Sequence, residues 1–339
     1  MLLIYLLFIL ILILWGIKIK ENDDYISKER CNSIKGIFIL LIVLTHSMQY
    51  ISGSGYGYGG MDMIVTFIRY RMGQMVVVMF LFYSGYGVSL SIRNKGETYV
   101  NGMPKRRLLT TLLNFDVAVL AFVVLNLIIA KPMTLRQVLL SMIAWDGVGN
   151  SNWYIFDILV CYAASYIVAK FMKGKDFGQW LLLLMALCML ILSFFKTPHW
   201  YNTLLAYPAG VIFAEHQHEI VKTLRKFYYP FLIVLSGIFV VSFYRLPEMR
   251  GISDNIASIC FAIIIVMLSM KIVAGNTFLS WCGDHLFPLY IYQRIPMIVM
   301  YECIGKDFVK DNALLFVIIS LATTCMIAHL YRHWRISLS

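Results

Sequence analysis

The sequence predicts an all-α protein, a polytopic membrane bundle of about ten to eleven transmembrane helices. Two features lead to this prediction. Of the 339 residues, 60% are hydrophobic and only 14% are charged, whereas about one quarter of the residues in a soluble protein are charged. The apolar residues also gather into stretches long enough to cross a bilayer. Helix is the expected state of these stretches, because backbone groups in lipid must be hydrogen-bonded within the segment.

Each expected span is an apolar stretch bounded by polar or charged residues. The spans are residues 1–17, 34–51, 74–92, 108–130, 152–169, 179–195, 200–214, 228–243, 253–270, 285–302 and 312–331. The first stretch has neither a basic segment before it nor a small-residue cleavage site after it, so we interpret it as a retained helix. Residues 1–30 then form an extra transmembrane helix with a cytoplasmic linker, followed by one membrane domain over residues 31–339.

The distribution of positive charge predicts the orientation in the membrane. Nineteen of the 29 Lys and Arg residues, Lys173 and Lys175 among them, fall in one set of alternate loops, and nine fall in the other set. Cytoplasmic loops carry the excess of Lys and Arg, which places the N-terminus outside and the C-terminus in the cytoplasm. The same distribution accounts for the net charge of +11, so we expect the lipid bilayer and not a nucleic acid as the partner.

Metal and disulfide sites are not expected. The seven cysteines include no CxxC pair, and cysteines inside apolar stretches act as small hydrophobic side chains. An H-x-H pair, His216 and His218, lies in a cytoplasmic loop and is a weak metal-binding pattern. We expect no metal and no permanently bound cofactor.

His46 is the first candidate for chemistry. It follows Lys35 by eleven residues, which is roughly 16 Å along a helix, so a lysine at the membrane face puts the histidine near the midplane. Ionisable side chains at that depth are costly and often functional. The imidazole could act as a general base or as an acyl-accepting nucleophile. The alternative is a packing histidine whose hydrogen bonds are made with Thr45 or Ser47.

Motifs on both sides of this span occur in an ordered series. Ten residues separate Lys35 from His46, and the next predicted span carries FLFYSGYG at residues 80–87. Further along are a basic patch at 105–107, NWYIFD at 152–157, YPAG at 207–210 and LYIY at 289–292. From about residue 30 to 331, this order and spacing resembles the acyltransferase-3 family of multi-pass membrane O-acyltransferases. Two positions depart from the family pattern: Arg106 and Arg107 are adjacent, and Gln293 stands where many members have His.

The resemblance implies acyl transfer, usually of acetyl, from a coenzyme A thioester in the cytoplasm. The acceptor would be a hydroxyl of a cell-surface or lipid-linked saccharide, and the location a bacterial plasma membrane. His46 would be the catalytic residue. The donor side would consist of Lys35, Arg106, Arg107, Ser84 and Gly85. The alternatives are an ordinary cytoplasmic charge excess for the basic residues and close helix packing for Ser84 and Gly85.

The acceptor side would consist of Trp153, Tyr154, Asp157 and Arg294. Aromatic rings stack on sugar rings and carboxylates accept sugar hydroxyl protons, although Trp153 also suits an interfacial aromatic belt. Arg294 falls near the midplane, where it needs a partner. Asp157, Asp116 or a bound ligand would serve, and Arg294 would then either form a structural ion pair or stabilise charge in the transition state.

Two other functions fit the same pattern of spans. A transporter or flippase for a saccharide or lipid would also have a polar midplane site, but it would not need a basic CoA entrance. A non-catalytic membrane scaffold is the second alternative. The acyltransferase hypothesis further predicts a tunnel through the membrane, because the donor comes from the cytoplasm and the acceptor from outside.

Overall fold

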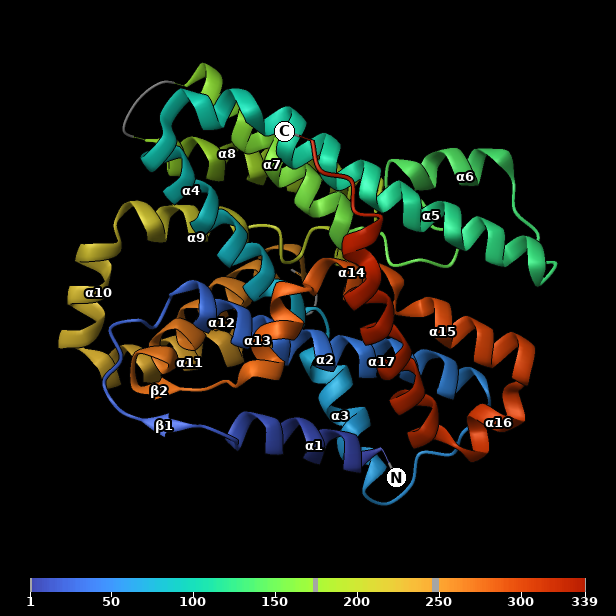
Figure 1. Cartoon of the computed structure of the whole chain (residues 1–339). Coiled ribbons are helices and arrows are strands. Elements are labelled where there is room, and N and C mark those ends of the chain that lie inside the picture. Colours follow the sequence, from blue (N-terminus) through green and yellow to red (C-terminus); the bar gives the residue numbers. More distant parts are fainter. Residues whose placement is uncertain (1, 173–175, 246–249, 339) are drawn as a thin grey trace.

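The computed structural model describes residues 2–172, 176–245 and 250–338, and nearly all of the regular structure in this part of the chain is helical (Figure 1). The α-helices are α1 Leu3–Leu14, α2 Lys28–Gly53, α3 Asp62–Met72, α4 Met75–Met103, α5 Thr110–Ile128, α6 Leu135–Met142, α7 Trp153–Phe171, α8 Phe177–Ser193, α9 Ala206–Glu215, α10 Gln217–Lys226, α11 Tyr228–Arg245, α12 Arg250–Lys271, α13 Thr277–Asp284, α14 Leu286–Tyr292, α15 Arg294–Val299, α16 Lys306–Asp311 and α17 Ala313–Leu330. Tighter or wider turns form η1 Pro104–Leu109, η2 Pro198–Trp200, η4 Met300–Ile304 and η5 Tyr331–His333. The loop residues Lys173 and Lys175 lie outside the described residues.

A membrane bundle is confirmed by the length and composition of the helices. Within the described residues, five helical stretches are long and apolar enough to cross a membrane, namely Lys28–Gly53, Met75–Ile128, Trp153–Phe171, Gly251–Lys271 and Ala313–His333. A sixth is a pair bent by 101°, made of α10 and most of α11. The stretch Met75–Ile128 contains two of the expected spans, with a change of direction at Gly96, whose φ of 54° suits glycine.

The remaining expected spans appear as shorter or broken helices. Helices α1 and α8 are apolar but shorter than those five stretches, and the expected span 285–302 is divided into α14, α15 and η4. Pro288 and Pro296 each lack the N–H that an unbroken helix needs, so the helix is interrupted before each of them. These interruptions place Gln293 and Arg294 at a joint between two helical segments.

Helix α2 lies in the middle of the bundle, and small residues let other helices approach it closely. A Cβ atom on Gly36 would overlap the Leu279 carbonyl oxygen of α13, and one on Gly283 would overlap the Asn32 carbonyl oxygen. The N-terminal helix α1 also packs on α2, where the Tyr5 hydroxyl donates to the Leu40 carbonyl oxygen at 3.2 Å. These contacts hold α2, which carries His46, among the other helices and away from lipid.

The ends of α1 lie near different parts of the chain. The backbone N–H of Leu3 donates to the Asp62 carboxylate at 3.3 Å, beside α3. Beyond the other end, Lys18 and Ile19 form β1, which pairs antiparallel with β2, Ile272–Val273. The helix therefore runs from the α3 end of the molecule to the end where α12 finishes (Figure 1).

Candidate functional site

The largest described cavity, of about 870 Å³, contains His46. We call it the outer cavity, because its loops belong to the set predicted to face outward. Its walls come from α2, α3, the start of α4, the loop before α7, η2 and the α14–α15 joint. The lining residues are Ile42, Thr45, His46, Gln49, Ser52, Tyr56, Tyr58, Thr66, Arg69, Tyr70, Gly73, Gln74, Val76, Val77, Asn150, Ser151, Asn152, Trp153, His199, Tyr290 and Arg294.

His46 lies at the buried side of this cavity. The residue is 8% exposed, and its ring interacts with the Gln293 side chain. Its Nδ1 atom has no hydrogen-bond partner in the described part of the chain. No hydrogen bond joins it to the neighbouring hydroxyls: Thr45 donates to the Leu41 carbonyl and Ser47 to the Met297 sulfur. The packing alternative, in which Thr45 or Ser47 satisfies the imidazole, is therefore wrong in its partners. An imidazole with a free ring nitrogen beside a cavity can accept a proton or an acyl group.

Arg294 is fixed next to His46 by neutral groups. Its Nε–H donates to the Ser151 hydroxyl at 2.9 Å and its Nη2–H to the Gln49 side-chain oxygen at 2.6 Å. No ion pair joins it to Asp157 or Asp116, so the expected carboxylate partner is wrong. Asp157 is fully buried, and both of its carboxylate oxygens lack a partner among the described residues. The arginine lies at a helix joint that opens toward the cavity, whereas Asp157 packs inside the bundle.

The three acceptor candidates of α7 have different positions. Trp153 lines the outer cavity, and its ring lies 6.3 Å from the ring of His199. Tyr154 points inward and packs its ring 5.2 Å from that of Tyr290. Asp157 follows one turn later and lines no described cavity. Only Trp153 of these three contacts the space in which a sugar would sit.

A tyrosine-bearing loop covers part of the outer cavity. Tyr56 and Tyr58 line the cavity, and their rings meet edge to face at 5.1 Å. The Tyr56 hydroxyl donates to the Asp62 carboxylate at 2.6 Å. That hydrogen bond is the main reason that the pKa of Tyr56 rises to about 12, with burial and the nearby negative charge adding to it. The Tyr56–Asp62 hydrogen bond therefore anchors the loop to the start of α3.

A second cavity, of about 360 Å³, contains the basic pair and is called the inner cavity. Its lining residues are Arg106, Arg107, Thr110, Thr111, Asn114, Asp284, His285, Phe287, Pro288, Ala328, Tyr331, Arg332 and Arg335. Four arginines thus meet one carboxylate. The C-terminal segment closes one side, where Asn114 donates to the Ile336 carbonyl oxygen at 2.8 Å and accepts from the Tyr331 hydroxyl at 2.6 Å.

The other donor-side candidates lie outside both cavities. Lys35 is on α2 and interacts electrostatically with Asp284, which does line the inner cavity. Gly85 lies at the crossing of α4 and α9, where an added Cβ would overlap the Tyr207 carbonyl oxygen. Ser84 precedes it and faces the Tyr162 hydroxyl. Gly85 is where two helix backbones meet, and Ser84 lies beside that crossing.

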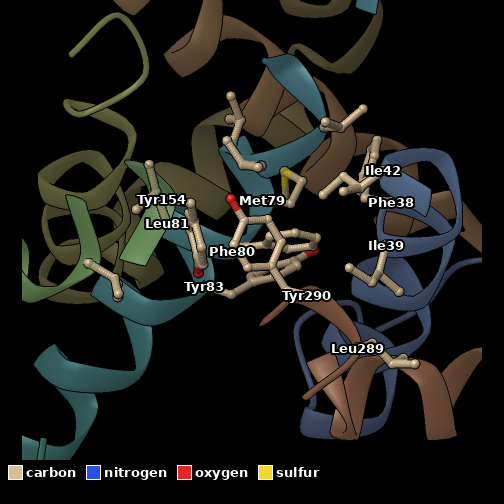
Figure 2. Packing of buried hydrophobic residues seen from close by; sticks show 14 of the residues in the cluster. Phe38, Ile39, Ile42, Met79, Phe80, Leu81, Tyr83, Tyr154, Leu289 and Tyr290 are labelled. Atoms are coloured by element: carbon tan, nitrogen blue, oxygen red, sulfur yellow. The ribbon is translucent and has the colours of Figure 1, made fainter. Parts of the chain in front are cut away.

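The two cavities share no lining residue, so the expected tunnel is two separate spaces in this structure. Buried aromatic side chains of α4, α7 and α14 gather near His46, and Figure 2 shows Phe80, Tyr83, Tyr154 and Tyr290 together. The hydroxyls of Tyr83 and Tyr290 have no hydrogen-bond partner among the described residues. Pro288 lines the inner cavity and Tyr290 the outer one. Helix α14 therefore contributes residues to both cavities.

Several lining residues were not singled out from the sequence. Arg69 of α3 and the neutral pair Gln49 and Ser151 belong to the outer cavity, and Arg332 and Arg335 belong to the inner one. The arginines were counted only as loop charges. When a charged residue lies outside any motif, the sequence does not indicate which cavity its side chain lines.

A helical bundle with apolar helices of spanning length and a polar cavity around a buried histidine defines a multi-pass membrane protein with an enclosed site. A family model described as an acyltransferase domain, that of the acyltransferase-3 family, matches residues 29–332. The chain therefore belongs to this family of membrane acyltransferases, as the ordered motifs indicated. No curated protein and no solved structure matches the chain significantly.

Proposed function

We propose that the protein is an O-acetyltransferase that moves acetyl from acetyl-CoA to a hydroxyl of a cell-surface or lipid-linked saccharide. The observation that carries this proposal is the position of His46, buried at the wall of a large outer cavity with a free Nδ1 atom. No other histidine of the described residues combines these two properties. Membership of an acyltransferase family makes acyl transfer the chemistry that His46 would perform.

Two routes use the imidazole. As a general base, His46 takes the proton of the acceptor hydroxyl while the hydroxyl oxygen attacks the thioester carbonyl. The C–S bond then breaks, and CoA leaves with a proton as the free thiol. As a nucleophile, His46 first accepts the acetyl group on a ring nitrogen, releasing CoA, and then passes it to the hydroxyl. In both routes Arg294 is positioned to stabilise negative charge on the carbonyl oxygen. Its bonds to Ser151 and Gln49 orient the guanidinium beforehand.

The inner cavity suits the donor. CoA carries phosphate groups, and Arg106, Arg107, Arg332 and Arg335 line this cavity. Arginine binds phosphate through paired N–H groups. The acetyl end would then have to pass from the inner to the outer cavity, and α14 lines both, with Pro288 in the inner one and Tyr290 in the outer one. Movement of Tyr290 would join the two cavities and bring the thioester to His46.

The outer cavity suits the acceptor. Trp153, Tyr56 and Tyr58 offer ring faces for sugar stacking, and Asn150, Asn152 and Gln74 offer hydrogen-bond donors and acceptors. Its volume of about 870 Å³ is within the usual range for a small-molecule site. The acceptor would therefore enter from the outside while the donor enters from the cytoplasm.

The test is transfer of labelled acetyl from acetyl-CoA to a panel of glycans by the purified full-length protein. We expect His46→Ala and His46→Gln to lower the rate by at least about a hundredfold, the usual effect of removing a general base. His218→Ala is the matched control, because His218 is exposed and lines neither the outer nor the inner cavity. Thermal unfolding of each variant shows whether the fold is kept.

Two outcomes would contradict the proposal. Transfer that survives both His46 substitutions in folded protein would remove His46 from the chemistry. Movement of an unmodified saccharide across proteoliposomes without any dependence on acetyl-CoA would indicate a transporter instead.

A further inference from the structure

We propose that the outer cavity selects an acceptor that carries an anionic group, a carboxylate or a phosphate, held between Arg69 and Arg294. This inference rests on the proposed function and names the substrate class of the same site. The carboxylate would belong to an acidic sugar, and the phosphate to a phosphorylated or diphosphate-linked saccharide. The two sources present the same chemistry to an arginine.

The charge of the cavity wall is the first argument. Among the described residues that line it, Arg69 and Arg294 carry fixed positive charge, and no Asp or Glu is present. The two arginines come from different parts of the chain, α3 and the α14–α15 joint, and meet across one space. Both act electrostatically on His46. The cavity therefore offers two positive charges close to the reacting group and no internal counter-ion.

Arg294 uses only part of its hydrogen-bonding capacity within the protein. A guanidinium has five N–H donors, and the hydrogen-bond partners of Arg294 are the neutral oxygens of Ser151, Gln49 and Tyr50. The Tyr50 ring lies 6.0 Å from its central carbon. These neighbours orient the group without neutralising it, which leaves its charge available to a ligand.

Arg69 also keeps most of its hydrogen-bonding capacity free within the described part of the chain. Its Nη1–H reaches the Ser52 hydroxyl at 3.5 Å, a long hydrogen bond, and no ion pair to it is found among the described residues. Asp62 is two turns earlier on α3, but it does not line the cavity. Its carboxylate accepts from the Tyr56 hydroxyl at 2.6 Å and from the Leu3 backbone at 3.3 Å. The acid nearest in sequence is thus engaged elsewhere.

Other basic residues of the chain do have carboxylate partners. Arg225 pairs with Asp23 at 2.6 Å and Lys271 pairs with Glu21 at 2.7 Å, both at the opposite end of α1. The outer cavity differs from these sites, although an uncompensated charge in a buried site is costly. An anion on the acceptor would neutralise the pair when the acceptor binds. Binding energy would then depend on the charge of the substrate and not only on its ring.

The test compares acceptors that differ only in charge. The acceptors are trigalactose, trigalacturonate with the same linkage, and trigalactose joined to a prenyl diphosphate, each titrated with labelled acetyl-CoA and detergent-solubilised full-length protein. We expect kcat/KM to be at least about tenfold higher for an anionic acceptor than for the neutral one, the effect of one charge-assisted hydrogen bond. A preference for the uronate indicates a sugar carboxylate, and a preference for the diphosphate indicates the linkage. The preference should fall as NaCl is raised.

Arg69 is the residue to vary, because Arg294 is also proposed to act in the reaction. We expect Arg69→Gln to raise KM for the anionic acceptor by about tenfold or more, and to raise KM for trigalactose much less. Arg69→Lys should keep part of the preference. Arg136→Gln is the matched control, since Arg136 is an exposed arginine of the predicted outer side that does not line the cavity.

The outcomes separate this inference from the proposed function. Equal transfer to all three acceptors, or an equal effect of Arg69→Gln on all three, would overturn the anion site and leave the transferase proposal intact. If no acceptor is acetylated, the transferase proposal fails, and binding of trigalacturonate against trigalactose still tests the anion site. That binding is measured by the change in tryptophan fluorescence of the His46→Ala variant as each sugar is added. The double variant that also carries Trp153→Phe shows how much of the change comes from Trp153. Equal binding of the two sugars, or binding of trigalacturonate unaffected by Arg69→Gln, would overturn the anion site.

Discussion

Arg106 and Arg107 are adjacent in the sequence but have different surroundings. Arg107 donates to the Tyr99 hydroxyl at 3.1 Å, and its guanidinium lies 5.6 Å from the centre of the Tyr162 ring. Arg106 is exposed and still lines the inner cavity. Arg107 therefore holds η1 near α4 and α7, whereas the exposed Arg106 makes no hydrogen bond or ion pair with the described residues. Both line the inner cavity, and we propose Arg106 as the one that contributes more to binding a donor phosphate.

This difference predicts the kinetics of two neighbouring substitutions. We expect Arg106→Gln to raise KM for acetyl-CoA by about tenfold or more with little change in kcat, because a charge-assisted contact to phosphate is lost. Lys105→Gln is the control, since Lys105 is exposed beside it and does not line the inner cavity. Steady-state kinetics with acetyl-CoA as the varied substrate measures both. An equal effect of the two substitutions would mean that only the general positive charge of this face matters.

At the scale of the element, the crossing of α4 and α9 depends on two glycines. A Cβ on Gly85 would overlap the Tyr207 carbonyl oxygen, and a Cβ on Gly210 would overlap the Phe82 carbonyl oxygen. The two backbones therefore touch directly, and each contact fails if a side chain is added. This crossing also positions Phe80 and Tyr83, which belong to the buried aromatic cluster near His46 (Figure 2).

Two alanine substitutions in α4 test this packing. Gly85→Ala should destabilise the protein by about 1–3 kcal/mol, the usual cost of overpacking. Gly87→Ala, two residues later in the same helix, has nothing within 4 Å of the added Cβ and should leave stability unchanged or slightly raised. Thermal unfolding in detergent distinguishes the two. A Gly85→Ala variant as stable as Gly87→Ala would show that the helices separate there without cost.

At the scale of the whole molecule, the broken helix α14–α15 contributes residues to both the inner and the outer cavity. Phe287 and Pro288 line the inner cavity, and Tyr290 and Arg294 line the outer one. Helix α1 also runs between the two ends of the bundle, from Asp62 to the β1–β2 pairing. The charge distribution predicts that these ends face opposite sides of the membrane, and the proposed donor and acceptor would then reach the protein from separate sides.

Cysteine labelling tests this orientation. Cys303 of η4 is exposed and lies in a loop predicted to face outward. A membrane-impermeant maleimide should label wild-type protein in intact cells, and Cys303→Ser should lose that label. In the same background, His218→Cys should react only after the membrane is permeabilised. Labelling of His218→Cys in intact cells would reverse the predicted topology.

Much of the fold and part of the candidate site follow from the sequence. The length and apolar character of 34–51 predict a helix that carries His46, and α2 covers this stretch as Lys28–Gly53. The place of Trp153 at the start of α7, beside the outer cavity, was also predictable from its motif. The broken form of 285–302 was not predicted, although Pro288 and Pro296 are the local signals for it.

The partners of charged residues could not be predicted in the same way. Arg294 was expected to meet Asp157, Asp116 or a bound ligand, and within the protein it meets Gln49 and Ser151. These partners are separated from it by 245 and 143 residues, and hydropathy does not specify how helices rotate about their axes. The position of Arg69 in the outer cavity likewise depends on tertiary packing, because α3 folds back over the end of α2.

The sequence by itself determined the membrane class, the helical state and the family, because these depend on local composition and spacing. The midplane depth of His46 stays a prediction. Only the tertiary structure decided which residues share a cavity. It placed Arg106 and His46 in different cavities, and it brought Arg69 and Arg294 to one cavity with no carboxylate among its lining residues. The physical reason is that helix packing, through contacts such as Gly85 on Tyr207 and Gly283 on Asn32, sets which side of each helix faces which space.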